Sequence, residues 1–260
     1  MMSEAERYTH LLYARLAGLA EDVQKASLRA VARSRADSMR VVDELLQEWA
    51  QDALRAWRRL ARRVLGAGWA EAERLSVQAH ERAPMADLPA IPTEYLQLYE
   101  RMARMRFEAG AQAVTEEVVD AVMRATTEGW DTPTLMQALR KIFGAWELWK
   151  LEAVARSETM RLWNGGLWNR FQAEQDLVGY EYAVVEDART SEICRGYEGK
   201  RVRRENLRDV PPLHPNCRTT LLPIYQWEAE GVEWQNPSDL PRPARYYGGT
   251  PPVLVVEATA

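Results

Sequence analysis

Cysteine, histidine and long apolar runs are all scarce in this sequence of 260 residues, and each scarcity excludes a class of protein. Two cysteines cannot cross-link a chain of this length into a disulfide scaffold. The apolar runs are short and interrupted by Arg or Glu, so no segment approaches the ~20 apolar residues of a membrane-spanning helix. The first residues are acidic and carry no apolar stretch of the kind that marks a secretory signal. We therefore expect a soluble protein that is made in a reducing compartment.

The sequence also lacks the common signatures of nucleotide binding and catalysis. It contains no glycine-rich phosphate loop ending in Lys-Ser or Lys-Thr, no GxGxxG after a strand, no HExxH and no GxSxG. The carboxylates of residues 1–130 are spaced like solvated helix faces, often with Arg three or four positions away. These absences remove the common enzyme mechanisms.

An excess of positive charge is missing as well, since 34 Lys and Arg face 38 Asp and Glu. A protein whose main partner is duplex DNA is usually strongly basic, because neutralised phosphates supply most of its affinity. Residues 187–218 form a small basic island with 8 basic and 5 acidic groups. A local contact with nucleic acid stays open there, through Arg195, Arg201, Arg203 and Arg204.

What the sequence does have is helical periodicity. Apolar residues recur at three- and four-residue spacing in the segment 1–83, which predicts long helices. Gly66-Ala67-Gly68 is a plausible helix stop, and the three prolines of 84–92 predict a linker. A further helix should begin at Thr93 and carry on one side Tyr95, Leu98, Met102 and Met105.

Helical periodicity resumes after Gly129. Thr132-Pro133 predicts a new helix start, and the apolar pattern that follows runs on toward Asn164. Gly165-Gly166 within this region is most simply a bend or a close-packing site.

From about residue 178 the pattern changes to short strands. Residues 178–185 predict a strand, 196–202 a turn and a second short strand, and 219–225 a third with Pro223 at a sheet edge. We therefore expect a mainly α protein with long N-terminal helices and a small α+β C-terminal domain. Its short antiparallel strands follow residue 178, and an extended Pro-rich tail ends the chain. The expected domain ranges are 1–83, 84–92, 93–225 and 226–260.

Two thiols and an imidazole lie close together in the turn-rich part of the chain. Cys194, His214 and Cys217 fall within 24 residues and resemble part of a zinc knuckle. Structural zinc sites want four ligands, however, and neither cysteine has a CxxC partner. Two interpretations remain open: a zinc site with an incomplete ligand set, or a packed turn with Cys194 buried like a small apolar residue. We expect no cofactor, with zinc as the alternative.

One constellation spanning roughly residues 130–224 resembles the signature of phage Mu protein F-like minor head proteins, including SPP1-type head morphogenesis proteins. The quoted pieces are Ala155-Arg156-Ser157-Glu158-Thr159, Asn164-Gly165, Asp187-x-Arg189-Thr190, Cys194, Gly199 and Pro211-Pro212-x-His214-Pro215-Asn216-Cys217-Arg218. The family commonly has further cysteines where this chain has Ser191 and Thr219, which favours a hydrogen-bonded turn over a metal site.

The resemblance implies a structural, few-copy minor capsid protein of a tailed bacteriophage, and not an enzyme. Such a protein would sit in the virion, at the portal vertex or capsid interior, after assembly in the host cytoplasm. Its expected partners are the portal protein, the major capsid protein and, weakly, packaged DNA, with no membrane. It would act in head assembly and in genome packaging or delivery.

Two other function classes stay open. One is a toxin-like transferase or nuclease centred on His214, and the other is a DNA-contacting protein that uses residues 189–208. Under the structural interpretation, the motif residues hold the C-terminal domain together. Asn164 and Arg156 lie eight residues apart on one helix face and could hydrogen-bond the strand-and-turn segment. Asp187 is expected to fix a turn by accepting backbone N–H groups.

Overall fold

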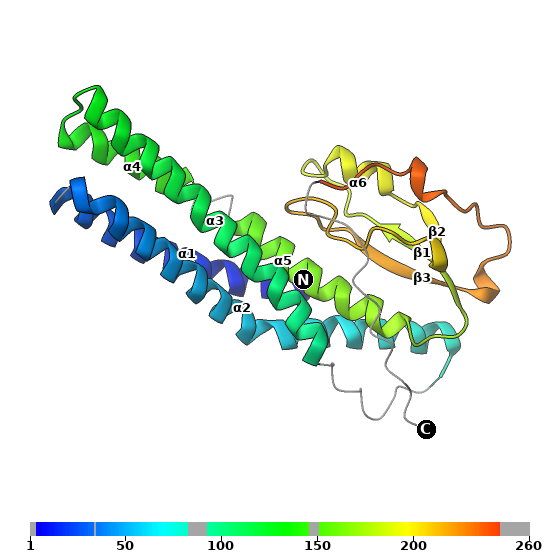
Figure 1. The fold of residues 1–260 in the computed structure, drawn as a ribbon. Coiled ribbons are helices and arrows are strands. Elements are labelled where there is room, and N and C mark those ends of the chain that lie inside the picture. Colours follow the sequence, from blue (N-terminus) through cyan, green and yellow to red (C-terminus); the bar gives the residue numbers. More distant parts are fainter. Residues whose placement is uncertain (1–3, 34, 83–92, 146–150, 245–260) are drawn as a thin grey trace. The chain divides into compact units, whose positions relative to one another are not determined.

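The computed structural model describes residues 4–33, 35–82, 93–145 and 151–244. Its helices are α1 (Glu4–Arg33), α2 (Arg35–His80), α3 (Thr93–Thr127), α4 (Thr132–Ala145), α5 (Leu151–Phe171) and α6 (Glu192–Tyr197). Its strands are β1 (Leu177–Ala183), β2 (Arg201–Arg203) and β3 (Thr220–Tyr225) (Figure 1). The expected fold class, mainly helical with short antiparallel strands in the C-terminal part, is confirmed. Within the described ranges no helix is long and apolar enough to cross a membrane.

By its internal packing the chain forms two compact units. The helical unit contains residues 7–60 and 96–155, and the mixed unit contains residues 1–6, 61–95 and 156–260. Both α2 and α5 contribute residues to each of the two units. Helices bury their apolar stripes against neighbours that are distant in sequence, so a compact unit need not be a continuous stretch.

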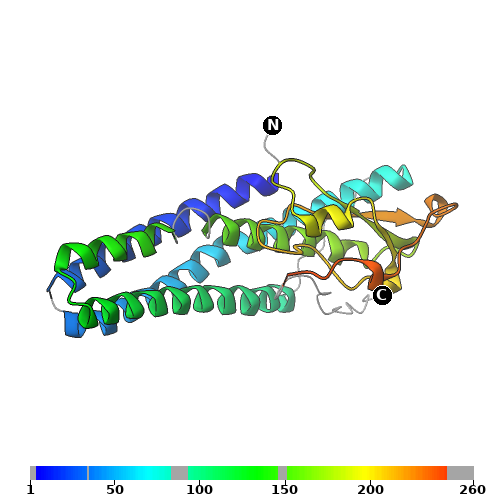
Figure 2. The ribbon, with the colours of Figure 1, turned by 90° about the horizontal axis from the view of Figure 1, so that it is seen from above.

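The helical unit consists mainly of α1, the first part of α2, α3 and α4, which run alongside one another (Figure 2). The periodic residues Leu16, Leu46 and Trp57 are buried in its core, as their spacing predicted. Trp49 meets Phe107 edge-on, with the ring centroids 6.0 Å apart. Aromatic pairs in this geometry stabilise a core beyond the area that they bury.

The helix that begins at Thr93 buries a different side from the predicted one. Leu98 and Met102 are only half-buried and Met105 is 66% exposed, while Tyr99, Ala103 and Phe107 are buried. Nothing can be said of the Tyr95 side chain, which lies outside the described residues. A second apolar stripe, one position further along, includes Phe107, whose contact with Trp49 buries more surface than a methionine side chain.

The predicted stop at Gly66-Ala67-Gly68 is wrong, since α2 continues to His80. A Cβ on Gly68 would lie 2.2 Å from the carbonyl oxygen of Trp163 in α5, and a Cβ on Gly166 would lie 2.3 Å from that of Leu65. The glycines therefore serve close packing between two helices of the mixed unit rather than helix termination. Close packing at Gly166, one of the two expected roles, is confirmed.

The helical run expected from Thr132 toward Asn164 is described in two pieces. The first is α4, which reaches Ala145, and the second is α5, which begins at Leu151. Residues 146–150 between them lie outside the described ranges.

The sheet of the mixed unit has the order β2-β1-β3, with both neighbours antiparallel to β1. Tyr180, Tyr182, Val202 and Leu221 are buried at 1% exposure or less, and with Cys194 and Cys217 they form part of one apolar core. Pro223 lies in an edge strand, as predicted, because a proline cannot donate to a second neighbour. The short helix α6, where a turn was expected from residue 196, was not predicted.

The described part of the tail, residues 226–244, contains no α-helix and packs against the sheet of the mixed unit. The backbone N–H of Gln235 donates to the carbonyl of Arg201 at 2.7 Å. The Tyr197 hydroxyl donates to the carbonyl of Pro241 at 2.6 Å, and Leu240 is buried in the core. The tail thus contributes packing to the small domain. Residues 245–260 lie outside the described ranges.

Candidate functional site

The two cysteines and the histidine meet in one place, which we call the thiol cluster. Its members are Ser191, Cys194, His214, Cys217 and Thr219. Cys194 Sγ lies 2.8 Å from His214 Nε2, 3.7 Å from Cys217 Sγ and 3.1 Å from Thr219 Oγ1. Ser191 Oγ lies 2.8 Å from the same imidazole nitrogen. Ser191 and Thr219, the two positions where the resemblance implied further cysteines, therefore both lie in the cluster.

Local backbone chemistry brings these side chains together. Ser191 is the N-cap of α6, and its Oγ accepts the backbone N–H of Cys194 at 3.2 Å, which starts the helix at the first thiol. In the loop before β3, the N–H of Cys217 donates to the carbonyl of His214 at 3.2 Å. Asn216 between them has a φ of 62°, a left-handed conformation that asparagine tolerates better than most residues.

The imidazole is oriented by the chain itself. His214 Nδ1 lies 2.6 Å from the carbonyl oxygen of Pro215, so this nitrogen carries a proton and donates. In the neutral ring Nε2 is then an acceptor, and it can accept a hydrogen bond from the Ser191 hydroxyl or from the Cys194 thiol. The ring is thus fixed between a backbone acceptor and two side-chain donors.

The two thiols titrate as a pair. The hydrogen bond between them lowers the pKa of Cys217 and raises the pKa of Cys194, since one charge in this buried place opposes a second. For His214, burial is the largest influence and lowers the pKa. The Cys217 sulfur and the Pro215 carbonyl outweigh it, so the pKa ends above its ordinary value.

The cluster fits part of a zinc site. The ligand atoms of Cys194, His214 and Cys217 all lie within 4.8 Å of one another. The 3.7 Å between the sulfurs is close to the edge of a tetrahedron with Zn–S bonds of about 2.3 Å. The hydroxyl oxygen of Ser191 lies 2.8 Å from the imidazole nitrogen, and that of Thr219 lies 3.1 Å from the Cys194 sulfur. Bound zinc would cross-link α6 to the loop that precedes β3.

The motif residues of α5 attach the helix to this loop and to β3. The Asn164 amide donates to the carbonyl of Thr219 at 3.1 Å, and its oxygen accepts the hydroxyl of Thr220 at 2.9 Å. Asn164 is fully buried, so these bonds also satisfy an otherwise costly amide. Ser157 Oγ accepts the N–H of Asn216 at 3.3 Å. The predicted brace between this helix face and the strand-and-turn segment is found at Asn164.

The other two motif residues of α5 take different positions. Arg156 is half-buried. Glu158 is 1% exposed and lies 4.0 Å from the buried Arg161 on the same helix. Glu158 therefore belongs to the interior of the mixed unit and does not line the thiol cluster.

Asp187 and Arg218 form a clamp at the entrance to the loop. The two terminal guanidinium nitrogens of Arg218 each donate to an oxygen of the Asp187 carboxylate at 2.6 Å, and the backbone N–H of Arg189 donates to it at 2.8 Å. These donors hold the pKa of Asp187 well below its usual range. The predicted turn at Asp187 is present, because Thr190 closes it by donating to the carbonyl of Val185 at 2.8 Å.

The remaining motif residues shape the backbone. Gly199 has a φ of +63°, and its N–H donates to the carbonyl of Tyr182 at 3.1 Å, which turns the chain from α6 into β2. Pro211 and Pro212 are buried beside the core, whereas Pro215 is exposed at the loop tip.

The basic island is largely engaged within the module. Arg201 pairs with Glu181 at 2.6 Å, and the Arg203 guanidinium lies 4.9 Å from the ring centroid of Trp234. Arg204 donates to the carbonyl oxygens of residues 172 and 174 at 2.8 Å. Arg195 is exposed on α6. Arg204, one of the predicted nucleic-acid contacts, thus binds the backbone at the end of α5.

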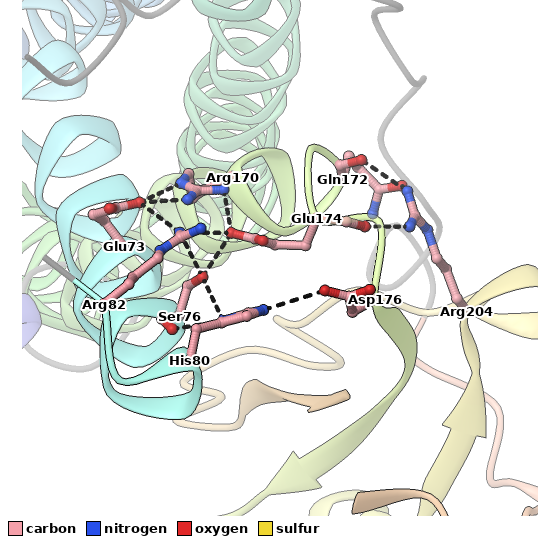
Figure 3. Close-up of polar contacts among 9 residues, drawn as sticks. All are labelled: Glu73, Ser76, His80, Arg82, Arg170, Gln172, Glu174, Asp176 and Arg204. Atoms are coloured by element: carbon pink, nitrogen blue, oxygen red, sulfur yellow. Dashed lines mark hydrogen bonds and ion pairs between the residues drawn. The ribbon is translucent and has the colours of Figure 1, made fainter. Parts of the chain in front are cut away.

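A buried ionic network, missed by the sequence analysis, joins the ends of α2 and α5 (Figure 3). Arg170 donates to Glu73 through two nitrogens and pairs with Glu174 at 2.6 Å. Ser76 and Arg82 also donate to Glu174, at 2.7 and 3.2 Å. Burial alone would raise the pKa of Glu174, but these hydrogen bonds and charges lower it. Glu73 and Arg170 are 97 positions apart in the sequence, so no local sequence pattern predicts their pairing.

His80 belongs to this network rather than to the surface alone. Its Nδ1 lies 2.7 Å from the carbonyl of Ser76, and its Nε2 lies 3.5 Å from Asp176 (Figure 3). The ring also contacts Tyr225 and Trp227 edge-on.

The arrangement suits bracing better than substrate binding. The hollow beside Cys194 and His214 has a volume of about 10 Å³, which is room for about one water molecule. Small-molecule sites usually offer about 300 Å³ or more. The cluster and the clamp both join segments of the same small domain, which is what a structural motif requires.

Comparison with known proteins gives one match. Residues 116–222 match the family model described as Phage Mu protein F like protein. No curated protein and no solved structure matches the chain. The matched segment contains every residue of the thiol cluster and of the Asp187–Arg218 clamp.

Proposed function

We propose, from the premise that residues 116–222 belong to the phage Mu protein F-like family, that this chain is a minor structural protein of a tailed-phage head. The family itself points to a head morphogenesis or structural role. Our proposal adds that the protein is present in few copies at the portal vertex or in the capsid interior. It would contact the portal or major capsid protein and act in head assembly and in genome packaging or delivery.

The observation that carries this proposal is the use of the motif residues as braces. Asn164 attaches α5 to the start of β3, and Arg218 clamps Asp187 across the loop. Cys194 and His214 share a hollow too small for a substrate. Because the motif residues contact one another within the domain, they favour a structural role in which other surfaces of the protein bind partners.

An enzyme centred on His214 remains the alternative from another class. It would require a substrate to displace the packed side chains around the imidazole, whose Nε2 lies against Ser191 and Cys194. If His214→Ala kept its thermal stability yet abolished a defined reaction, we would adopt this alternative. Loss of stability is the result that the structural role predicts.

Contact with packaged DNA is proposed as weak and local. Arg195 is exposed on α6, whereas Arg201 and Arg204 are committed to partners within the module. The chain as a whole is acidic, with a formal net charge of −4. Strong salt-dependent duplex binding by the isolated protein would contradict this view, because it requires many free cations.

The direct test is co-expression with a cognate portal and major capsid protein, followed by gradient sedimentation and mass spectrometry of the particle fraction. We expect the chain in particles at a low, fixed stoichiometry. Arg218→Ala should reduce its incorporation by releasing the Asp187 clamp, and Arg195→Ala is the matched control on an exposed arginine. Recovery of the wild-type chain only as free protein would refute the proposal.

A further inference from the structure

We propose that Cys194 and Cys217 are an oxidative modification site, at which a small-molecule disulfide such as oxidised glutathione drives formation of an intramolecular disulfide. The sulfurs already lie 3.7 Å apart. A disulfide bond is about 2.05 Å long, so the two atoms must approach by less than 2 Å. No other cysteine exists in the sequence to compete for either partner.

The two thiols differ in access, and this difference sets the order of events. Cys194 is only 3% exposed, but it lines a small surface hollow together with Ser191 and His214. Cys217 is fully buried and does not line this hollow. The hollow of about 10 Å³ is too small for oxidised glutathione, so the exchange requires the side chains around Cys194 to move aside. This opening exposes Cys194 before Cys217, whose sulfur lies 3.7 Å from that of Cys194.

The chemistry is ordinary thiol–disulfide exchange in two steps. Cys194 Sγ attacks one sulfur of oxidised glutathione, forms a mixed disulfide and releases one glutathione thiolate, which takes up the proton that Cys194 loses. Cys217 Sγ then attacks Cys194 Sγ, the mixed disulfide breaks, and the second glutathione leaves with the Cys217 proton. Two protein thiols are oxidised and one glutathione disulfide is reduced to two thiols, so atoms and electrons balance.

The bond would tie α6 to the loop that precedes β3. These segments are now joined only by hydrogen bonds and packing around the cluster. A covalent link there restricts the unfolded chain more than the folded one, so it should stabilise the module. This inference rests on the proposed virion role: the disulfide would form, and stabilise the mixed unit, when a particle leaves the reducing host cytoplasm. Zinc held by the same sulfurs would block the reaction.

The experiment uses the purified full chain, reduced, freed of reductant and metal, and then incubated natively with oxidised glutathione. The protein is denatured, alkylated and analysed by intact mass and peptide mapping. We expect loss of both alkylation sites, a mass lower by two hydrogens, and one peptide pair linking Cys194 to Cys217. The oxidised chain should contain no disulfide between two chains and should unfold at a higher temperature. Because no other virion protein is present, this result is independent of the particle assay.

Matched serine variants separate the two steps. Cys217→Ser should retain glutathione on Cys194, because the resolving thiol is gone, and Cys194→Ser should stay unmodified, because Cys217 is buried. Unfolding temperatures establish that each variant is folded. The wild-type peptide map decides the matter even if a variant does not fold. Two thiols that still alkylate fully, a mixed disulfide that persists on the wild type, or a disulfide-linked dimer would each overturn the proposal.

Discussion

Replacing Gly68 with alanine should destabilise the mixed unit, although alanine is normally the better helix residue. In an exposed helix interior, Gly→Ala stabilises by about 0.5–1 kcal/mol, since glycine loses more backbone freedom on folding. At Gly68 the added Cβ would meet the Trp163 carbonyl oxygen at 2.2 Å, whereas ordinary contact begins at 3.4 Å. The contact is with backbone, so no side chain can rotate away.

The expected size follows from this geometry. To restore ordinary contact, α2 and α5 must separate locally by roughly 1.2 Å, the difference between 3.4 and 2.2 Å. Overpacking of this kind costs about 1–3 kcal/mol. Gly110→Ala in α3 is the matched control, because a Cβ there meets nothing within 4 Å. The propensity gain is common to both variants, so their difference of about 1–3 kcal/mol measures the packing cost.

Urea unfolding followed by circular dichroism gives the two stabilities. Because the chain has two compact units, its unfolding need not be a single transition. Hydrogen exchange in peptides from α5 therefore localises the effect, and Gly68→Ala should speed it while Gly110→Ala should not. Equal stability of the two variants, with unchanged exchange in α5, would refute the close packing of these helices.

Three further predictions concern charges and ligands. Arg170→Met should cost about 3–5 kcal/mol in denaturant unfolding, because it leaves the buried carboxylate of Glu73 without its main partner, whereas the exposed control Arg74→Met should cost about 1 kcal/mol or less. The arginine partner of Asp187 lowers the pKa of that carboxyl, so the pair stabilises fully above the unfolded pKa of about 3.9 and loses this contribution as pH falls through the lower folded pKa. Asp187→Asn should therefore differ most from wild type near neutral pH in thermal melts, and a difference that grew in acid would contradict the assignment. Thr219→Cys should raise the affinity for Co²⁺, read by its thiolate absorption bands, because Oγ1 already lies 3.1 Å from a cluster sulfur. Binding no tighter than that of the wild type would show that this position is not a corner of the site.

The local chemistry of the sequence was enough for much of the fold. Periodic apolar residues placed the long helices, and β-branched and aromatic residues placed the strands near 177–183 and 220–225. The block ending in Arg218 was enough for the resemblance to the phage Mu F-like family, which the match over 116–222 confirms. For Cys194, His214 and Cys217 the sequence left two interpretations open, an incomplete zinc site or a packed turn.

Other features depended on partners that are far away in sequence. The close approach of Gly68 to Trp163 of α5 explains why α2 does not stop there, and the contact of Phe107 with Trp49 belongs to the face that α3 buries; neither contact can be read from local spacing. The ion pair of Glu73 with Arg170 spans 97 positions. The sequence by itself determined the long helices and the three strands, though not the length of α2 or the short α6, since local structure depends mainly on neighbours within a few residues. Only the tertiary structure decided which faces are buried and which charges are paired, because both depend on contacts that local spacing does not encode.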